Sequence, residues 1–166
     1  ASNMTDRLAA LRSLAFYGSE AQRGDALSEF YDNWQHEALD VNQWFQVQAM
    51  IGEVDALERV AQLGLHPDFD IRNPNKVRAL VGAFANNNPV NFHRIDGAGY
   101  RFLADRIEEL NELNPQVASR LVTPITKWRN YLGRGDLMRE QLQRLAALPN
   151  LSRDVYEVVT KSLGAG

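Results

Sequence analysis

Gln116 and Arg120 are the pair of side chains in this sequence best suited to hold a ligand. They lie four residues apart, and residues at this spacing share one face of an α-helix. Asn114 is a favourable helix cap and Pro115 a favourable first helical residue, so a helix is expected to start here. From that helix, a guanidinium can donate two hydrogen bonds to a carboxylate or carbonyl group, while an amide both donates and accepts.

Two interpretations of this pair stay open from the residues alone. Either the two side chains bind a ligand, or Arg120 pairs with a nearby carboxylate and Gln116 merely fills the first turn. Arg78 presents a similar choice, because it follows Asn73-Pro74 at the start of another expected helix. It either lines the same wall as Arg120 or makes an ordinary surface salt bridge.

No pattern in the sequence predicts a catalytic centre or a metal site. The nearest approach to a zinc-protease motif is His36-Glu37-Ala38-Leu39-Asp40, where Asp40 stands in the place of the second metal-binding histidine. The glycine-rich stretch at residues 97–99 lacks the third glycine and the lysine-serine pair of a phosphate loop. No serine lies in a nucleophile elbow. We therefore predict that this chain holds neither catalytic nor metal-binding residues.

Amphipathic helices account for nearly the whole chain, because apolar residues recur at helical spacing and strand-type alternation is nearly absent. Thr5 or Asn3 is expected to cap the first helix, which Gly18 ends. The others are expected at about 20–34, from 40, and at 54–63, 75–86, 89–93, 97–113, 115–131, 135–147 and 151–163. Pro124 lies inside one of them, so a bend is expected near residues 121–124.

A weak internal repeat favours a curved stack of helices. The pattern Pro-x-x-Val-x-x-Leu-Val that begins at Pro74 returns as Pro-x-x-Ala-x-x-Leu-Val at Pro115, 41 residues later. This period is typical of HEAT-like helix pairs, which stack on their neighbours and expose a concave surface. Antiparallel helices joined by short Asn-Pro turns explain the motif almost as well. We predict an all-α fold in which residues 1–166 form one curved, HEAT- or armadillo-like stack of antiparallel helix pairs.

Composition excludes several classes of protein. The chain of 166 residues has 45% apolar and 23% charged residues and no cysteine, which is ordinary for a soluble globular protein. It has no apolar run of about 20 residues and no secretory signal, so neither a membrane-spanning segment nor secretion is predicted. The absence of cysteine is compatible with a reducing cytosol.

The charge is divided unevenly along the chain. Residues 19–70 hold eleven acidic residues against two basic ones, whereas residues 71–166 hold fourteen basic residues against nine acidic ones. The simplest interpretation is one acidic and one mildly basic solvated face. A sharper one is that the basic half faces an anion such as the carboxylate of a peptide. Nucleic acid is not an expected partner, since the total charge is −3 and no basic-aromatic stripe occurs.

Six short motifs, in order along the chain, resemble the C-terminal helical domain of bacterial aminopeptidase N, in the M1 family of zinc exopeptidases. They are Asn3-Met4-Thr5-Asp6, Asn73-Pro74-Asn75-Lys76-Val77-Arg78, Gly82-Ala83-Phe84-Ala85, Asp96-Gly97-Ala98-Gly99-Tyr100, Asn114-Pro115-Gln116-Val117-Ala118-Ser119-Arg120 and Leu151-Ser152-Arg153-Asp154-Val155-Tyr156-Glu157.

The resemblance implies a binding role for this chain without catalysis of its own. In the family, the glutamine and arginine matching Gln116 and Arg120 point into an internal cavity that faces the zinc site. The zinc ligands and the motif that holds the substrate amine belong to an upstream catalytic domain. The resemblance therefore implies no cofactor in this chain, whereas the parent enzyme is expected to bind zinc. The implied partners are the catalytic and N-terminal domains and peptide substrates, and the implied location is cytoplasmic.

A second hypothesis is an independent helical-repeat scaffold that binds a partner protein in its concave groove. The 41-residue period and the charge division support it. The many family motifs count against it, as does a sequence that begins abruptly in a helical pattern. We therefore expect a piece of a longer enzyme.

Overall fold

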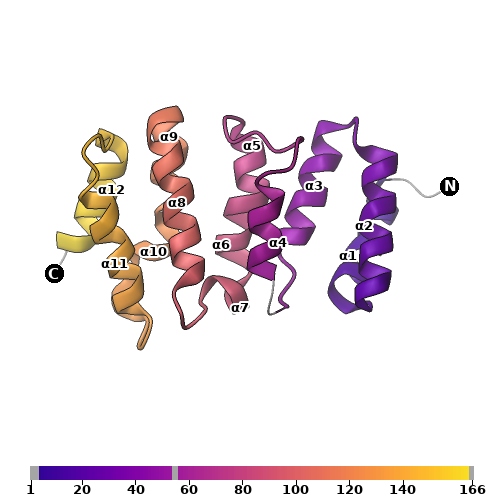
Figure 1. The fold of residues 1–166 in the computed structure, drawn as a ribbon, viewed down its shortest axis with the longest axis horizontal. Coiled ribbons are helices and arrows are strands. Elements are labelled where there is room, and N and C mark those ends of the chain that lie inside the picture. Colours follow the sequence, from indigo (N-terminus) through magenta and orange to yellow (C-terminus); the bar gives the residue numbers. More distant parts are fainter. Residues whose placement is uncertain (1–3, 54–55, 165–166) are drawn as a thin grey trace.

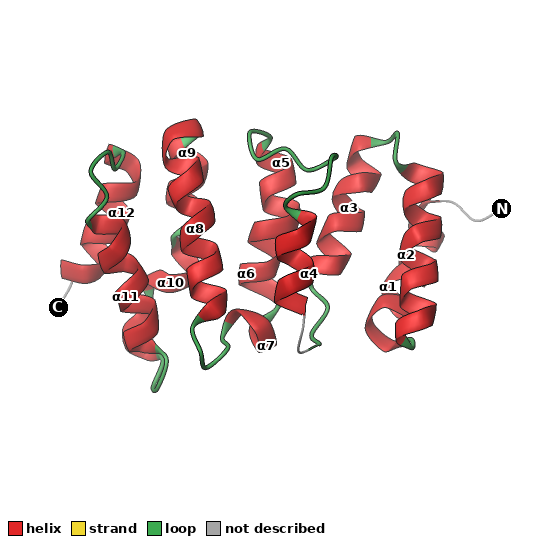
Figure 2. Cartoon of the chain, in the orientation of Figure 1, coloured by secondary structure: helices red, strands yellow, loops and turns green. Residues whose placement is uncertain are grey.

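The computed structural model describes residues 4–53 and 56–164, and this part of the chain is built of helices without any β-strand (Figure 2). The all-α prediction is confirmed. The elements are α1 (Met4–Tyr17), α2 (Glu20–Trp34), α3 (Ala38–Ala49), α4 (Ala56–Leu63), α5 (Pro74–Val77), the π-helical η1 (Arg78–Gly82), α6 (Ala83–Asn87), α7 (Pro89–Phe92), α8 (Ala98–Leu113), α9 (Pro115–Leu121), α10 (Thr123–Thr126), the 3₁₀ turn η2 (Trp128–Asn130), α11 (Gly135–Ala146) and α12 (Arg153–Gly164).

The helices stack in two layers along the long axis of the molecule (Figure 1). One layer holds α2, α4, α8 and α11, and the other holds α1, α3, the α5–η1–α6 segment, α9 with α10, and α12. Contacts between the layers pair α1 with α2, α3 with α4, α8 with α9 and α11 with α12. Within the second layer α3 packs on α1 and on η1, and α12 packs on α9. This arrangement confirms the predicted stack of antiparallel helix pairs.

One apolar core runs through the stack, from Leu11 in α1 to Val159 in α12. Aromatic side chains fill much of it. Phe84 meets Phe92 and Phe102 edge-on, with ring centroids 6.0 and 5.5 Å apart, a favourable geometry for aromatic pairs. Leu14 shares the helical spacing of the buried Leu11 and Ala15 but is 38% exposed. It lines a groove between α1 and α2 at this end of the stack.

Three Asn-Pro pairs start helices, as the sequence predicts for two of them. Asn73, Asn88 and Asn114 each precede a proline, and each side-chain oxygen accepts hydrogen bonds of 3.0–3.4 Å from backbone N–H groups two or three residues ahead. The cap supplies an acceptor to a donor that the first turn leaves free, and the proline loses no helical bond there. The caps at Asn73 and Asn114 are 41 residues apart, in agreement with the repeat.

Two of the expected continuous helices are interrupted. The helix expected at 115–131 is divided into α9, α10 and η2, and Val122 separates the first two. Pro124 lies in the first turn of α10, where its missing N–H costs nothing, so the chain breaks where a bend was expected. The helix expected at 75–86 contains the π-helical η1 in its middle. Thr5 lies inside α1, while Asn3 and Val54 fall outside the described residues.

No helix in the described part of the chain is long and apolar enough to cross a membrane.

Candidate functional site

Gln116 and Arg120 lie on the first two turns of α9, and both side chains are exposed. The opposite face of the helix carries Val117, Ala118 and Leu121, which are buried in the core and fix its orientation. Within residues 4–53 and 56–164, neither Gln116 nor Arg120 makes a side-chain hydrogen bond or an ion pair. The interpretation in which Arg120 pairs with a neighbouring carboxylate is therefore not what the structure shows. Both side chains are free to contact a ligand.

Arg78 is also exposed, immediately after α5. Its Nη2 donates a hydrogen bond of 3.0 Å to Oδ1 of Asn75, and it forms no ion pair among the described residues. The 41-residue shift relates Asn75 to Gln116 but relates Arg120 to Ala79, which is only 9% exposed. Arg78 therefore belongs to the same layer as Arg120 without occupying the equivalent helical position.

The first turns of α5 and α9 lie at the same edge of the stack, at the top of Figure 1. The two asparagine caps thus lie at one edge of one layer. Lys76, in the same turn as Asn75, does not add to this polar edge. Its side chain is buried and its Nζ lies 5.6 Å from the centre of the Phe45 ring, and burial lowers the pKa of Lys76.

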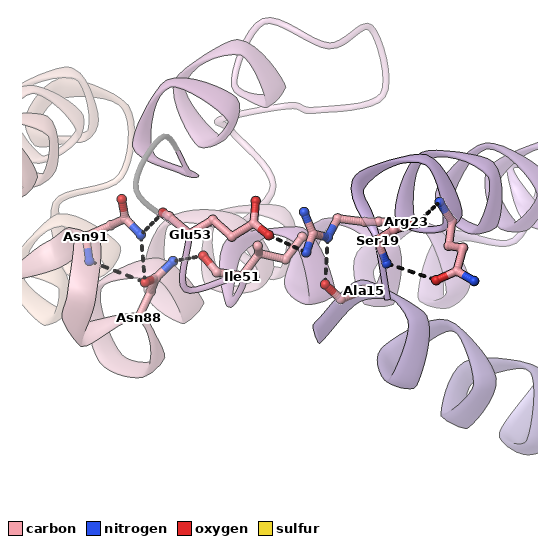
Figure 3. A network of polar contacts seen from close by, with 8 residues as sticks. Ala15, Ser19, Arg23, Ile51, Glu53, Asn88 and Asn91 are labelled. Carbon is pink, nitrogen blue, oxygen red and sulfur yellow. Dashed lines mark hydrogen bonds and ion pairs between the residues drawn. The ribbon is translucent and has the colours of Figure 1, made fainter. Parts of the chain in front are cut away.

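A buried arginine forms a second polar centre, between the first two helix pairs (Figure 3). Arg23 in α2 is 2% exposed. Its Nε donates to the carbonyl of Ala15 at 2.7 Å, and its Nη2 meets Oε1 of Glu53 at 2.6 Å. The hydrogen bond from Arg23 holds the pKa of the Glu53 carboxyl below its usual value. In the sequence, Arg23 is simply one of the two basic residues in the acidic stretch 19–70.

Two buried asparagines extend this centre towards the middle of the stack (Figure 3). Nδ2 of Asn88 donates to the carbonyls of Ala49 and Ile51 at 2.9 and 2.8 Å, and Nδ2 of Asn91 donates to the Glu53 carbonyl at 2.7 Å. They satisfy the backbone that follows α3, where no helical partner is available. The Asn88-Pro89 pair was the one available signal, since it matches the other two Asn-Pro helix starts.

Two of the histidines make hydrogen bonds within the fold, and the third lies on the surface. Nδ1 of His66 accepts a hydrogen bond from the backbone of Asp68, and His93 shares a 2.6 Å hydrogen bond with the hydroxyl of Tyr100. Burial, with a smaller contribution from Arg134, lowers the pKa of His93. His36 is exposed. No group of three His, Cys, Asp or Glu side chains in the described ranges is placed to hold a metal ion, so these residues do not fit a zinc site.

The sequence matches a family model over residues 1–164, described as a domain of unknown function (DUF3458_C) with ARM repeats. It is also similar to proteins named aminopeptidase N. The identity is 48% over 165 residues with that of Caulobacter vibrioides, and 44% over 164 residues with those of Haemophilus influenzae and Escherichia coli. These alignments cover 98–99% of this chain but only 19% of each relative.

A solved structure has the same fold. Legionella pneumophila aminopeptidase A, in complex with aspartic acid, superposes with a TM-score of 0.92 at 37% identity, and the match covers 99% of this chain and 19% of that one. The matched region is the C-terminal part of the aminopeptidase N relatives. The chain therefore belongs to the DUF3458_C family of ARM-repeat domains, the C-terminal helical domain of bacterial aminopeptidase N.

Proposed function

We propose that this chain is the non-catalytic domain of a zinc-dependent aminopeptidase, where it caps the active-site chamber and helps to hold peptide substrates. The single observation that carries the proposal is an amide and a guanidinium together on one exposed face of α9, neither of them paired within the described residues. The chain that holds them aligns along 98–99% of its length with aminopeptidases. The parent enzyme would remove the N-terminal residue of a peptide. In it, the layer that holds α5 and α9 would face the catalytic domain.

The chemistry of the two side chains suits the leaving portion of a peptide. The Arg120 guanidinium has five N–H donors and no competing acceptor among the described residues, so it can bind a peptide carbonyl or the C-terminal carboxylate. Gln116, one turn earlier, can accept from a peptide N–H and donate to a carbonyl. Arg78 would contribute a third contact from the neighbouring helix, once it gives up its bond to Asn75.

The metal chemistry belongs outside this chain. Bound zinc would supply an activated water in the catalytic domain, and no group of three His, Cys, Asp or Glu side chains among the described residues is placed to hold it. The purified chain, supplied with zinc, is therefore expected not to hydrolyse an aminoacyl p-nitroanilide above the buffer rate. Steady turnover that scales with the amount of this chain and disappears with a chelator would contradict that expectation.

We also propose a cytoplasmic location for the parent enzyme, because a chain without cysteine suits a compartment in which disulfides do not form.

Arg120→Ala in the full-length enzyme tests the gripping role. We expect kcat/KM for a tripeptide to fall about tenfold, the usual loss for a charge-assisted hydrogen bond. The value for an aminoacyl p-nitroanilide should stay nearly unchanged, because that substrate has no peptide beyond the scissile bond. The measurement is steady-state kinetics of both substrates with the same enzyme preparation.

Arg153→Ala is the matched control, since the Arg153 side chain is 89% exposed on α12 and, among the described residues, pairs only with Glu157. It removes the same charge from another helix of the same layer and should leave kcat/KM unchanged for both substrates. The gripping role would be contradicted if the Arg120 variant lost the same factor in kcat/KM for both substrates. It would also be contradicted if the Arg120 and Arg153 variants lost the same factor.

A further inference from the structure

A groove lies between α2, α3 and α4, close to the buried Arg23 and separate from the exposed face of α9. Its volume is about 390 Å³, which falls in the usual range for small-molecule sites. The lining contains two guanidinium groups, one carboxylate, two neutral polar side chains and an apolar wall. These residues are Glu20, Arg23, Gly24, Leu27, Ser28, Trp44, Gln48 and Arg59.

The Arg23 guanidinium keeps one nitrogen without an acceptor. Nε and Nη2 are bonded to Ala15 and Glu53, but Nη1 is buried and makes no hydrogen bond. Figure 3 shows this nitrogen without a dashed line, pointing away from Ala15. A buried donor left unpaired costs about 1–3 kcal/mol, and a ligand oxygen that reached Nη1 would recover that free energy.

Arg59 adds a second guanidinium without an acceptor to the same lining. In the described part of the chain it makes neither a side-chain hydrogen bond nor an ion pair, although its charge is close enough to Glu53 to help lower the pKa of that carboxyl. Both arginines line the groove, and a guanidinium can donate two hydrogen bonds to a carboxylate.

The remaining lining residues select against a simple anion. Glu20 is exposed in the first turn of α2 without an ion pair among the described residues, so an ammonium group can approach it. Arg23 is already balanced by Glu53, which leaves the charges of Arg59 and Glu20 to cancel. Leu27 and the ring of Trp44 provide apolar surface. A ligand of zero net charge with opposite charges at two points matches this set.

We propose that the groove binds a free α-amino acid in its zwitterionic form. The ligand carboxylate would contact Arg59 and Nη1 of Arg23, and its ammonium group would contact Glu20. An apolar side chain would pack on Trp44 and Leu27. The site lies on α2–α4 and not on α9, so this proposal does not depend on the role of Gln116 and Arg120.

Titration of the ¹⁵N-labelled chain with L-leucine, followed by NMR, tests the proposal. We expect saturable shifts of the Trp44 Nε1–H and Gln48 signals, with a Kd of about 1 mM or tighter. N-acetyl-L-leucine, which lacks the ammonium group, and L-leucinamide, which lacks the carboxylate, should each bind at least about tenfold more weakly. The absence of saturation with leucine, or equal binding of all three probes, would overturn the proposal.

Variants of the half-buried Arg59 and the exposed Glu20 assign the contacts. Arg59→Gln and Glu20→Gln should each weaken leucine binding about tenfold, as expected for the loss of one charged hydrogen-bonding partner. Arg153→Gln, which removes a charge at the far end of the stack, should leave the Kd unchanged. Circular dichroism verifies that each variant is folded. Leucine binding that is unaffected in both groove variants would show that the ligand does not use this site.

Discussion

Replacing Gly99 with alanine is expected to destabilise the fold by about 3 kcal/mol. Gly99 is the second residue of α8 and is buried. An added Cβ would overlap the carbonyl oxygen of Phe92 and lie 2.7 Å from that of Asn91. Both are backbone atoms of α7, which cannot rotate away, so α7 and α8 would have to separate. The free energy of unfolding, measured by urea denaturation with circular dichroism, reports this change.

Gly24→Ala is the matched control for this prediction. Gly24 lies inside α2, and a Cβ there meets no atom within 4 Å. Alanine has a higher helix propensity than glycine, so this change should stabilise the chain by about 0.5–1 kcal/mol. Similar midpoints for the two variants would mean that α7 and α8 are not as closely packed as the structure shows.

Replacing Arg23 with alanine is expected to lower the free energy of unfolding by about 3 kcal/mol. The change removes a guanidinium that ties the end of α1, through Ala15, to the segment after α3, through Glu53. The buried Ala15 carbonyl loses a side-chain donor, and a cavity is left between two helix pairs. Urea denaturation again measures the effect. Arg23→Lys should recover less than half of it, because one ammonium cannot span both acceptors.

Arg59→Ala provides the comparison, since this arginine lies in the same groove but has no side-chain hydrogen bond among the described residues. It should change the free energy of unfolding by less than about 0.5 kcal/mol. A loss as large as that of the Arg23 variant would show that general charge, and not the bonds of Arg23, holds the two pairs together.

The Arg23–Glu53 pair also predicts how stability depends on pH. The pKa of Glu53 is lowered in the folded state by the hydrogen bond from Arg23. Its contribution to stability is therefore present above the ordinary carboxyl pKa of 4.5 and is lost as the pH falls through the lower folded value. Unfolding free energies measured between pH 6 and 3 should fall less steeply in Arg23→Met, a volume-matched variant, than in the unchanged chain. If the free energy of unfolding falls equally steeply with pH in both proteins, this pH dependence does not come from the Arg23–Glu53 pair.

Local features of the structure could be read from the sequence because their interactions span only a few residues. Asn73 and Asn114 bond to backbone groups two or three residues ahead, and Pro124 acts on its own turn. The break at Val122 was therefore located, although the separation into α9, α10 and η2 was not. The degree to which Leu14 is covered depends on the neighbours that pack on α1, and a helical periodicity cannot supply that information.

The polar centre around Arg23 could not be predicted for the same reason. Arg23 reaches Glu53 across 30 residues, and Asn88 reaches Ala49 across 39. Nothing near Arg23 in the sequence distinguishes it from an exposed helical arginine. The exposure of Gln116 and Arg120 follows from the helical face opposite Val117 and Leu121. That Arg120 forms no ion pair within the described residues could be learned only from the positions of the neighbouring helices.

The amino-acid sequence by itself determined the helical class, the capped starts of α5 and α9, the 41-residue repeat and the family, because these depend on periodicity, short-range bonds and ordered motifs. Tertiary structure alone decided which polar side chains are buried, which arginines lack an acceptor among the described residues, and where α2, α3 and α4 leave a groove. Those properties depend on contacts between helices that lie far apart in the chain, and the energy of each contact is fixed only when the packed neighbours exclude water.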